Sequence, residues 1–416
     1  MDRWTADLLD VTVYDYASLS DNRRAAFDAL MDTRFPPSVY GQHRAMRRNA
    51  LRQSNRTREL LAAGTQHFPP FVPGSSLVPD KKSLEGTAIV FTAGGEGERL
   101  RLSLHGRGIT EASLRDFTKA TFPLPEFAGN PGTLHINLLM VAALCRETGI
   151  DIPVVITTGP AGSVTAQVIP RLVEKHGNFG LKHIRIIGQN ERLFLTDDEK
   201  IVFRETAAGP VPVTHPDETG GPVMKLKEPS PEGSVLEWMN RLGTTRTIIV
   251  QATALYNQSL LPLMAAALDN HDCLGVGILR SEFPPTDPYG TYVSIDLDGT
   301  DTMQIIEQDV RNEATRSITD TGDRWHLPFN TGFYAFDNTL LAGNDLPDFA
   351  TPPKVLRPDL PRTPKIGYAA TDLVSLAKNP VILTIESSLF GVLKNADDLK
   401  TLSALGKQFG FEELCR

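Results

Sequence analysis

The sequence predicts an α/β fold in which a mixed, mainly parallel sheet is flanked by helices. Short, continuous apolar runs alternate with helical patterns from about residue 87 to 280, as parallel strands buried on both faces do. The chain has 416 residues, 41% hydrophobic and 22% charged, enough for a large core in roughly two to three domains. We expect a helical N-terminal region with a linker (1–85), the sheet domain (86–345) and a small C-terminal α+β region that completes the site (346–416).

The N-terminal region is expected to be helical. Ser20 is a candidate cap for a helix over 21–34, and a second helix is expected over 42–63. The second helix carries four arginines at i, i+4 spacing, where like charges repel: Arg44, Arg48, Arg52 and Arg56. We interpret them as a solvated basic face docked near acids of another segment, and an anion or partner site is the alternative. The Pro-, Gly- and Ser-rich stretch 68–80 predicts an extended linker.

Strands and helices alternate along the rest of the chain. Apolar, β-branched runs predict strands at 87–95, 151–160, 183–189, 246–255 and 273–280. Helical spacing predicts helices at 134–148, 163–177 and 258–270, the second of them interrupted at Pro170. The alternating run 291–299 ends in Asp-Gly and predicts a hairpin strand. Further strands are expected at 329–337 and 381–387, with a terminal helix near 399–409.

The composition argues against several classes of function. The net charge of −8 disfavours bulk binding to nucleic acid or to an anionic membrane. No apolar stretch reaches the ~20 residues of a membrane-spanning helix, and the acidic N-terminus lacks a signal-peptide pattern. The three cysteines lie far apart and match no zinc-binding spacing. We therefore expect a cytoplasmic enzyme that binds neither nucleic acid nor membrane.

A glycine-rich loop, TAGGEGERLR at 92–101, directly follows the first strand of the sheet domain. Its glycines, Gly94, Gly95 and Gly97, let the backbone approach a base or a phosphate at the edge where open α/β sheets bind nucleotides. The loop is not GxGxxG, because Leu100 stands at the third glycine, and it is not a P-loop. It therefore predicts either an ordinary turn or a nucleotide site of another kind.

The loop and six later segments resemble a known family. AGGEGERL, followed by a lysine before FPLP, is similar to the nucleotide loop of sugar-1-phosphate nucleotidyltransferases. Later segments resemble, in order, those of eukaryotic-type UDP-N-acetylhexosamine pyrophosphorylases: IIGQNER (186–192), EPSPEGSVLEW (228–238), IIEQD (305–309), FNTGFY (329–334), PKIGYAATDLV (364–374) and LFGVLKNADDL (389–399). The resemblance implies a nucleotidyltransferase Rossmann-like fold. It also implies transfer of a nucleoside monophosphate from a triphosphate, UTP by expectation, to a sugar 1-phosphate, with release of pyrophosphate.

The same resemblance implies roles for individual residues. Arg99 and Lys119 would hold the phosphates that leave, and Lys394 would bridge the α-phosphate and the incoming sugar phosphate. The nucleotide would contact Gly94, Gly95, Gly97, Gln189, Pro231 and Gly233. The sugar or its phosphate would contact Glu307, Asn330, Gly332 and Lys365. Asp372 would bind Mg²⁺, the implied cofactor, together with the nucleotide phosphates.

Each of these residues also has a structural interpretation. Asp372 could cap the helix that follows it, and Glu307 could lie on a solvated face. Asn330 and Gly332 could shape a bulge. Pro231 and Gly233 could form only a turn before a helix capped by Ser234. The two lysines at 119 and 394 could be ordinary surface residues.

The chain departs from the family pattern at several positions. Thr118 stands where the family has proline, Glu98 where it has threonine, and Thr253 where a metal-binding aspartate is expected. Val235 and Phe333 replace residues near the sugar, so the acceptor stays open among hexosamine, hexose and cyclitol phosphates, with GTP as the alternative to UTP.

Two other functions stay open at this point. One is a catalytically weakened, nucleotide-binding regulatory protein. The other is a dinucleotide-dependent oxidoreductase, which would need an acid ~20 residues after the glycines, near Glu111 or Asp116. A homo-oligomer is compatible with the sequence.

Overall fold

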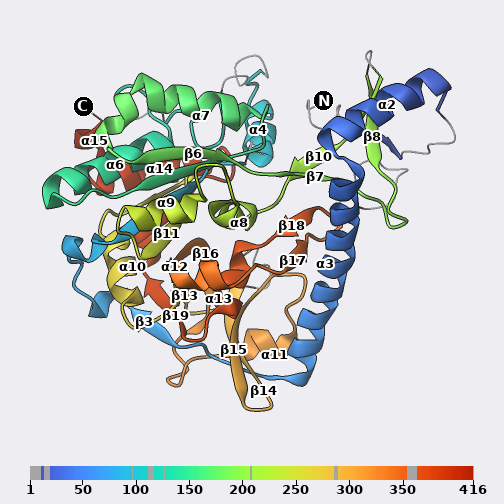
Figure 1. Cartoon of the computed structure of the whole chain (residues 1–416). Helices are drawn as coiled ribbons and strands as arrows, with labels where there is room; N and C mark the ends of the chain where they lie inside the picture. Colours follow the sequence, from blue (N-terminus) through green and yellow to red (C-terminus); the bar gives the residue numbers. More distant parts are fainter. Residues whose placement is uncertain are drawn as a thin grey trace.

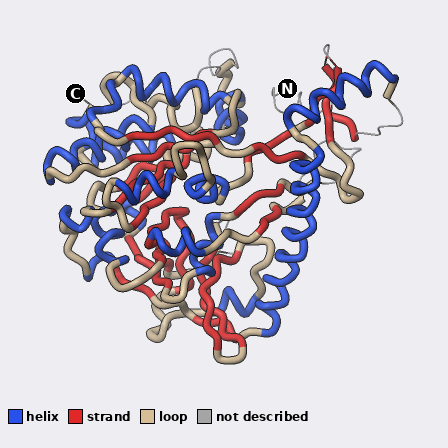
Figure 2. Tube along the Cα trace, viewed as in Figure 1, coloured by secondary structure: helices blue, strands red, loops and turns tan. Residues whose placement is uncertain are grey.

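The computed structural model describes residues 11–13, 19–95, 97–110, 117–124, 127–206, 209–284, 289–353 and 363–415. Within them, an eleven-stranded mixed sheet forms the centre of the molecule (Figure 1; Figure 2). Its path runs β3 (Phe71–Pro73), β19 (Pro380–Ile385), β13 (Cys273–Arg280), β16 (His326–Asp337), β11 (Arg246–Gln251), β4 (Thr87–Thr92), β5 (Val154–Thr158) and β6 (Ile184–Gly188). Along this path, neighbouring strands are parallel except where β16 runs antiparallel between β13 and β11. The predicted mixed, mainly parallel sheet is confirmed.

Helices cover both faces of this sheet, which explains the continuous apolar strands. In β4, Ile89 and Phe91 pack into one core cluster, whereas Ala88 and Val90 pack into the other. The first cluster includes side chains of α6 (Thr133–Thr148), α7 (Val164–Lys175), α10 (Leu260–Leu268) and α14 (Asp398–Gln408). The second includes side chains of α8 (Gly221–Lys227), α9 (Val235–Arg241), α12 (Asn338–Gly343) and α13 (Leu373–Leu376). A strand with helices on both sides has no polar face, so its sequence does not alternate.

Smaller strand pairs surround the main sheet. The hairpin predicted at 291–299 is confirmed as β14 (Thr291–Leu297) and β15 (Thr300–Ile306), and both turn residues, Asp298 and Gly299, have positive φ. β14 also pairs with β2 (Thr65–His67) and with β16. The remaining pairs are β1 (Val11–Val13) with β8 (Val202–Thr206), β8 with β9 (Gly209–Pro212), β10 (Thr214–Pro216) with β7 (Glu191–Leu193), β12 (Ala254–Tyr256) with β20 (Phe390–Val392), and β17 (Asp348–Ala350) with β18 (Ile366–Tyr368).

Short helices complete the described elements. They are α4 (Glu98–His105), α11 (Glu313–Ser317) and α15 (Phe411–Leu414), with 3-10 turns η2 (Gly74–Ser76), η3 (Lys81–Leu84), η4 (Gly177–Gly180), η5 (Ala370–Asp372) and η6 (Ser387–Leu389). Across the described residues, no helix combines the length and the apolar composition that crossing a bilayer demands.

Two sequence-based expectations need correction. Pro170 does not interrupt its helix, since α7 continues through it. A proline inside a helix costs about 3 kcal/mol, and burial of Ile169 and Val173 against the sheet, worth about 1.5–3 kcal/mol each, offsets that cost. The stretch 68–80 is only partly the extended linker that was predicted, because Phe71–Pro73 form β3, which pairs in parallel with β19, and Gly74–Ser76 form the 3-10 turn η2. The main sheet thus takes strands from all three predicted regions.

The N-terminal helices are close to the prediction. α2 (Asp21–Arg34) has the predicted bounds, and Ser20 occupies the N-cap position without a capping hydrogen bond from its side chain. The second helix, α3 (Pro37–Ala63), begins earlier than predicted because Pro37 suits the first turn of a helix, where its missing N–H is not needed. At about 1.5 Å per residue its 27 residues span about 40 Å, along one side of the molecule (Figure 1).

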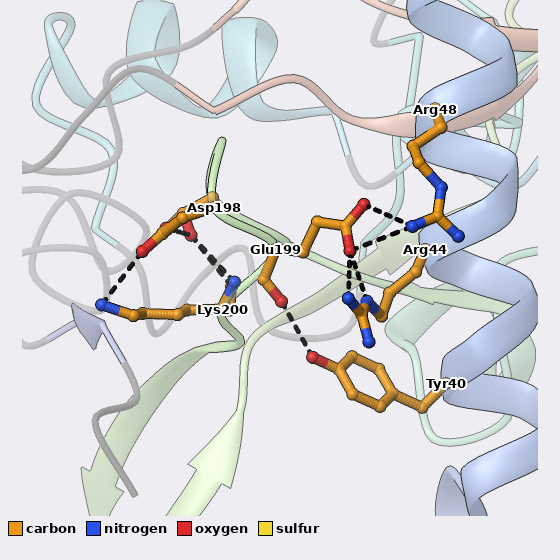
Figure 3. Close-up of polar contacts among 7 residues, drawn as sticks. Tyr40, Arg44, Arg48, Asp198, Glu199 and Lys200 are labelled. Atoms are coloured by element: carbon orange, nitrogen blue, oxygen red, sulfur yellow. Dashed lines mark hydrogen bonds and ion pairs between the residues drawn. The ribbon is translucent and has the colours of Figure 1, made fainter.

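The basic face of α3 is docked against acids of another segment (Figure 3). Arg44 and Arg48 both donate to the carboxylate of Glu199, and Tyr40 donates its hydroxyl to the Glu199 carbonyl at 2.8 Å. Arg52 instead donates to Asn49 on the same helix. The interpretation as a docked basic face is therefore confirmed for Arg44 and Arg48, whereas Arg56 lines the cleft described below.

Candidate functional site

A large cleft of about 2450 Å³ lies at the carboxyl ends of the central strands. Its floor is formed by residues that follow β4, β6 and β11, and α3, β15 and β17 contribute its walls. The strand order reverses at β4, because β5 and β6 follow on one side and β11 on the other. Open α/β sheets bind ligands at such a point.

The cleft brings most of the predicted site residues together. Its lining includes Gly94, Gly95, Arg99, Lys119, Gln189, Glu307, Asn330, Gly332, Lys365, Asp372 and Lys394. Gly97, Pro231 and Gly233 are not part of this lining. The side chain of Glu98, and both Glu111 and Asp116, lie outside the described residues.

Gly94 and Gln189 form a close-packed pair at the base of the glycine loop. A methyl group at position 94 would overlap the Gln189 side-chain oxygen. The Gln189 amide is 8% exposed, and its Nε2 donates to the Glu218 carbonyl at 2.8 Å. Its backbone N–H donates to the Thr158 carbonyl at the end of β5. The amide is thus held in one orientation, and only glycine fits beneath it.

The loop at 216–222 lines the cleft beside Gln189, and the sequence analysis did not identify it. Pro216, Glu218, Thr219 and Pro222 all belong to the lining. Gly220 donates to the Tyr368 carbonyl at 2.8 Å, and a side chain at 220 would collide with the backbone of β18 and the residue after it. The glycine pair in PDETGGP was the signal that could have indicated a close backbone approach.

The structure does not bring Pro231 and Gly233 to the cleft. Gly233 has φ +89° and closes a turn through its N–H to the Ser230 carbonyl at 2.9 Å. Helix α9 follows directly, with a capping box formed by Ser234 and Glu237. The structural interpretation, a turn before a capped helix, describes these two residues.

Three cations from different segments meet at the other side of the glycine loop. Lys119 packs against Gly97, whose φ is +81°, and a side chain at 97 would lie 2.9 Å from the Lys119 Cβ. Burial, and then the charges of Lys394 and Arg99, lower the pKa of Lys119 to about 8. The three cations therefore make the end of the cleft beside the glycine loop positive, as a polyphosphate site is.

Two backbone hydrogen bonds fix the position of the main chain at Lys394. Its N–H donates to the Asp398 carboxylate at 2.7 Å, and the preceding Leu393 N–H donates to the Thr253 carbonyl at 2.9 Å. The Lys394 ammonium lies 3.6 Å from the centre of the Tyr289 ring. The sequence analysis did not single out Tyr289, because its contact with Lys394 joins segments about a hundred residues apart in the chain.

Asn330 and Gly332 both line the cleft and shape a bulge. Gly275 is paired with Tyr334 and Gly277 with Asn330, so β16 carries extra residues between these two pairs. The Asn330 side-chain oxygen accepts from the Gly332 N–H at 2.8 Å, and its Nδ2 donates to the Tyr334 hydroxyl at 2.7 Å. Gly332 has φ +77°, and a methyl group there would overlap the Gln251 amide.

Phe333 does not face the cleft. Its side chain is fully buried, edge-on to Tyr256 and Phe390 with ring centres 5.1 and 5.3 Å apart. The departure from the family pattern at this position therefore changes the core beneath the bulge rather than the cleft lining.

The carboxylates of the cleft are dispersed. Burial raises the pKa of Asp372 to about 7. Asp372 occupies the N-cap position of α13, but its side chain makes no capping hydrogen bond there. Glu307 follows β15 and is exposed. Lys365 Nζ lies 3.9 Å from a Glu218 carboxylate oxygen.

Among these carboxylates, Asp372 can serve as the one protein ligand of a magnesium ion. Among the described residues, no three His, Cys, Asp or Glu side chains come close enough to hold a metal ion. Thr253 stands where the aspartate is expected and is nearly buried, 9% exposed. Mg²⁺ commonly uses one or two carboxylates with substrate phosphates and water, and Asp372 alone fits that smaller requirement.

Solved structures share this fold. The UDP-N-acetylglucosamine pyrophosphorylase of Trypanosoma brucei, solved with an inhibitor, matches with a TM-score of 0.67 at 14% identity, covering 95% of this chain and 80% of that chain. An Entamoeba histolytica protein assigned as a UDP-N-acetylglucosamine pyrophosphorylase matches with a TM-score of 0.62 at 18% identity, over 81% and 86%. A mutant UDP-glucose pyrophosphorylase of Leishmania major, in complex with UDP-glucose, matches with a TM-score of 0.57 at 13% identity, over 92% and 79%. The chain therefore has the fold of the UDP-sugar pyrophosphorylases. No family model and no curated protein sequence matches it.

Proposed function

We propose that this protein, which has the fold of the UDP-sugar pyrophosphorylases, transfers a nucleoside monophosphate from a nucleoside triphosphate to a sugar or sugar-like 1-phosphate and releases pyrophosphate. One observation carries the proposal. Arg99, Lys119 and Lys394 meet beside the glycine loop in a cleft that also contains the buried Gln189 amide. This arrangement suits a triphosphate whose base and phosphates are bound at opposite sides of the loop.

The reaction needs positive charge more than it needs a base. A phosphate monoester is largely dianionic at neutral pH, with a second pKa of ~6, so its oxygen attacks without losing a proton to the protein. The bond from that oxygen to the α-phosphorus forms, and the bond from the α-phosphorus to the pyrophosphate oxygen breaks. Charge neutralisation and alignment then control the rate.

Each cation has a place in this scheme. Arg99, near the start of α4, and Lys119, in the turn at 119–121, would hold the departing β- and γ-phosphates. Lys394 would contact the α-phosphate and the acceptor phosphate, where charge accumulates. Mg²⁺ bound to Asp372 and the phosphates would supply further charge neutralisation.

UTP is the triphosphate that the site favours in our proposal. The Gln189 amide lies at the edge of the cleft with a fixed orientation, and an amide can pair with a uracil carbonyl and N–H together. The Leishmania major structure of this fold that contains UDP-glucose supports a uridine nucleotide and a hexose as one pair of ligands. A guanosine nucleotide with a cyclitol phosphate remains the alternative pair.

The acceptor is proposed to bind between Asn330 and the walls formed by α3 and β15. Glu307, Lys365 and Gly332 line this part of the cleft with Asn330. Uncharged side chains of β15 add hydroxyl and amide groups, from Thr300, Thr302 and Gln304. Such groups suit a ligand rich in hydroxyls, as sugars and cyclitols are.

A second function is favoured by one observation. Thr253 replaces the metal-binding aspartate expected from the family, and no group of metal-binding side chains forms among the described residues. The loss of this aspartate is consistent with a protein that binds a nucleoside triphosphate without turning it over.

Pyrophosphate release separates the two functions. We would measure it with Mg²⁺, four nucleoside triphosphates and a panel of hexose, hexosamine and cyclitol 1-phosphates. Release that requires both substrates is expected, and it would identify the base and the acceptor together. Nucleotide binding without release would support the second function, and the absence of nucleotide binding would refute both.

A further inference from the structure

The Lys394 ammonium lies against the aromatic ring of Tyr289. The distance from Lys394 Nζ to the ring centre is 3.6 Å. Cation–π attraction acts within about 6 Å of a ring centre, so this contact is close. Both residues line the cleft.

The Tyr289 ring is itself firmly supported. It stacks on Phe329 with ring centres 4.7 Å apart and an interplanar angle of 26°. The Tyr289 carbonyl accepts from the Arg311 guanidinium at 2.9 Å, and Arg311 is 9% exposed. Phe329 immediately precedes Asn330 in β16. The Tyr289 ring therefore packs against β16, the strand that carries Asn330 of the proposed acceptor site.

The Tyr289 ring supports the Lys394 ammonium in the protein without substrate. The Lys394 backbone is fixed by Asp398 and by the Thr253 carbonyl, but its ammonium shares the cleft with Lys119 and Arg99. Three like charges in one cleft repel, which drives flexible side chains outward. The negative face of an aromatic ring attracts the ammonium and provides a neutral surface that a phosphate can displace.

We propose that Tyr289 is a positioning residue, which holds the Lys394 ammonium in the cleft of the free protein and releases it to the acceptor phosphate. This inference rests on the proposed function for its catalytic consequence. The contact itself does not, and it can be measured in the protein without substrate. When a dianionic phosphate enters, the ammonium exchanges the ring for phosphate oxygens, which bind a cation more strongly.

The first experiment reports the contact directly. Lysines are reductively methylated with ¹³C, and the Lys394 signal is assigned by its loss in Lys394→Arg. Ring current should shift this signal upfield in the wild type and in Tyr289→Phe, and the shift should disappear in Tyr289→Leu. Adding inorganic phosphate, as a probe of the acceptor-phosphate position, or UTP, whose α-phosphate Lys394 would contact, should move the wild-type signal downfield. A wild-type signal at the position of exposed lysines, or one unchanged by saturating inorganic phosphate and UTP, would overturn the proposal whether or not the protein turns substrate over.

The second experiment reports the consequence for turnover. Tyr289→Leu should lower kcat/KM for the sugar 1-phosphate about 3- to 30-fold, while the Kd for UTP stays within about two-fold. Tyr289→Phe, which keeps the ring, should restore activity to near the wild type. Tyr40→Leu is a matched control, because Tyr40 also faces a cation, with the Arg44 guanidinium 5.7 Å from its ring centre, but is not in the cleft lining.

The outcomes separate the two proposals. Full activity in Tyr289→Leu would refute the positioning role while leaving the nucleotidyltransferase function intact. No pyrophosphate release by the wild type on any substrate pair would refute the function, and the methyl signals would still decide whether Tyr289 holds Lys394. If Tyr289→Leu fails to fold, the wild-type titration and Tyr289→Phe retain the test.

Discussion

Gly94→Ala tests whether the glycine loop serves to seat the Gln189 amide. An added methyl group overlaps the Gln189 side-chain oxygen, so the amide must move. The surroundings allow little movement, since Gln189 is 8% exposed and its Nε2 donates to the Glu218 carbonyl at 2.8 Å. We expect the substitution to break this hydrogen bond and to turn the amide away from the orientation that would meet a base.

The magnitude follows from the broken contact. Losing a hydrogen bond with one partner left in place costs about 1–3 kcal/mol. If the displaced amide no longer pairs with uracil, an energy of this size is lost from binding, and the Kd for UTP rises about 5- to 150-fold. The same change should reduce the preference for UTP over CTP and GTP, because the base-reading edge is lost.

Isothermal titration calorimetry with Gly94→Ala, Gln189→Ala and the double variant makes the test sharp. The severe overlap of the methyl group is with the Gln189 side chain, and its next neighbour is the Gly159 backbone nitrogen at 3.3 Å. The double variant should therefore bind UTP little more weakly than Gln189→Ala alone. Gly41→Ala is a matched control, since Gly41 is exposed on α3 and an added methyl group meets nothing within 4 Å. Wild-type affinity in Gly94→Ala, or penalties that add in the double variant, would refute the reasoning.

Three further predictions concern charge. The value of kcat/KM should fall as pH rises through about 8, the lowered pKa of Lys119, because only the charged ammonium holds phosphate. Lys119→Arg should move this alkaline limb to higher pH, since a guanidinium keeps its charge. Lys394→Ala should lower kcat about 100-fold or more with less than about a three-fold change in nucleotide Kd, because the Lys394 charge acts mainly in the transition state. Glu199→Gln should lower the free energy of unfolding, measured with urea, by about 0.5–1 kcal/mol, since its two arginine partners are about half exposed and water screens the pairs.

Each of these predictions has a control or an outcome that contradicts it. An unchanged alkaline limb in Lys119→Arg would assign that limb to another group. Lys400→Ala, an exposed lysine on α14, should keep wild-type turnover, and full activity in Lys394→Ala would refute its role. Tighter UTP binding in Glu199→Gln, in which Arg44 and Arg48 lose the carboxylate that neutralises them, would favour the alternative in which the basic face of α3 takes part in anion binding.

Much of the sheet follows from short stretches of sequence. The run before the glycine loop predicted β4, because a strand covered by helices on both faces has a continuous apolar centre, here Ala88 to Phe91. Gln189 was also named from the sequence as a nucleotide contact, since it directly follows the apolar run of β6 at the sheet edge where the glycine loop lies. In both cases the relevant residues are neighbours in the chain.

The assignment of Pro231 and Gly233 shows where this reasoning stops. Two segments of similar composition, at 216–222 and 228–238, each offer a proline followed by glycine. Only the pairing of β10 with β7 carries the first segment back beside Gln189, whereas the second is used to begin α9. Composition does not distinguish them, because the difference lies in strand pairing.

The sequence by itself determined the alternation of strands and helices, the glycine loop after the first buried strand and the docked helix with its arginines. Tertiary structure decided which charges meet. Lys394 reaches the glycine loop because β20 pairs with β12 and Leu393 bonds to Thr253, and Tyr289 reaches Lys394 because its ring stacks on Phe329. Periodicity and turn chemistry act over a few residues, whereas these contacts join segments that lie from tens to more than a hundred residues apart, and only the packed sheet brings such segments together.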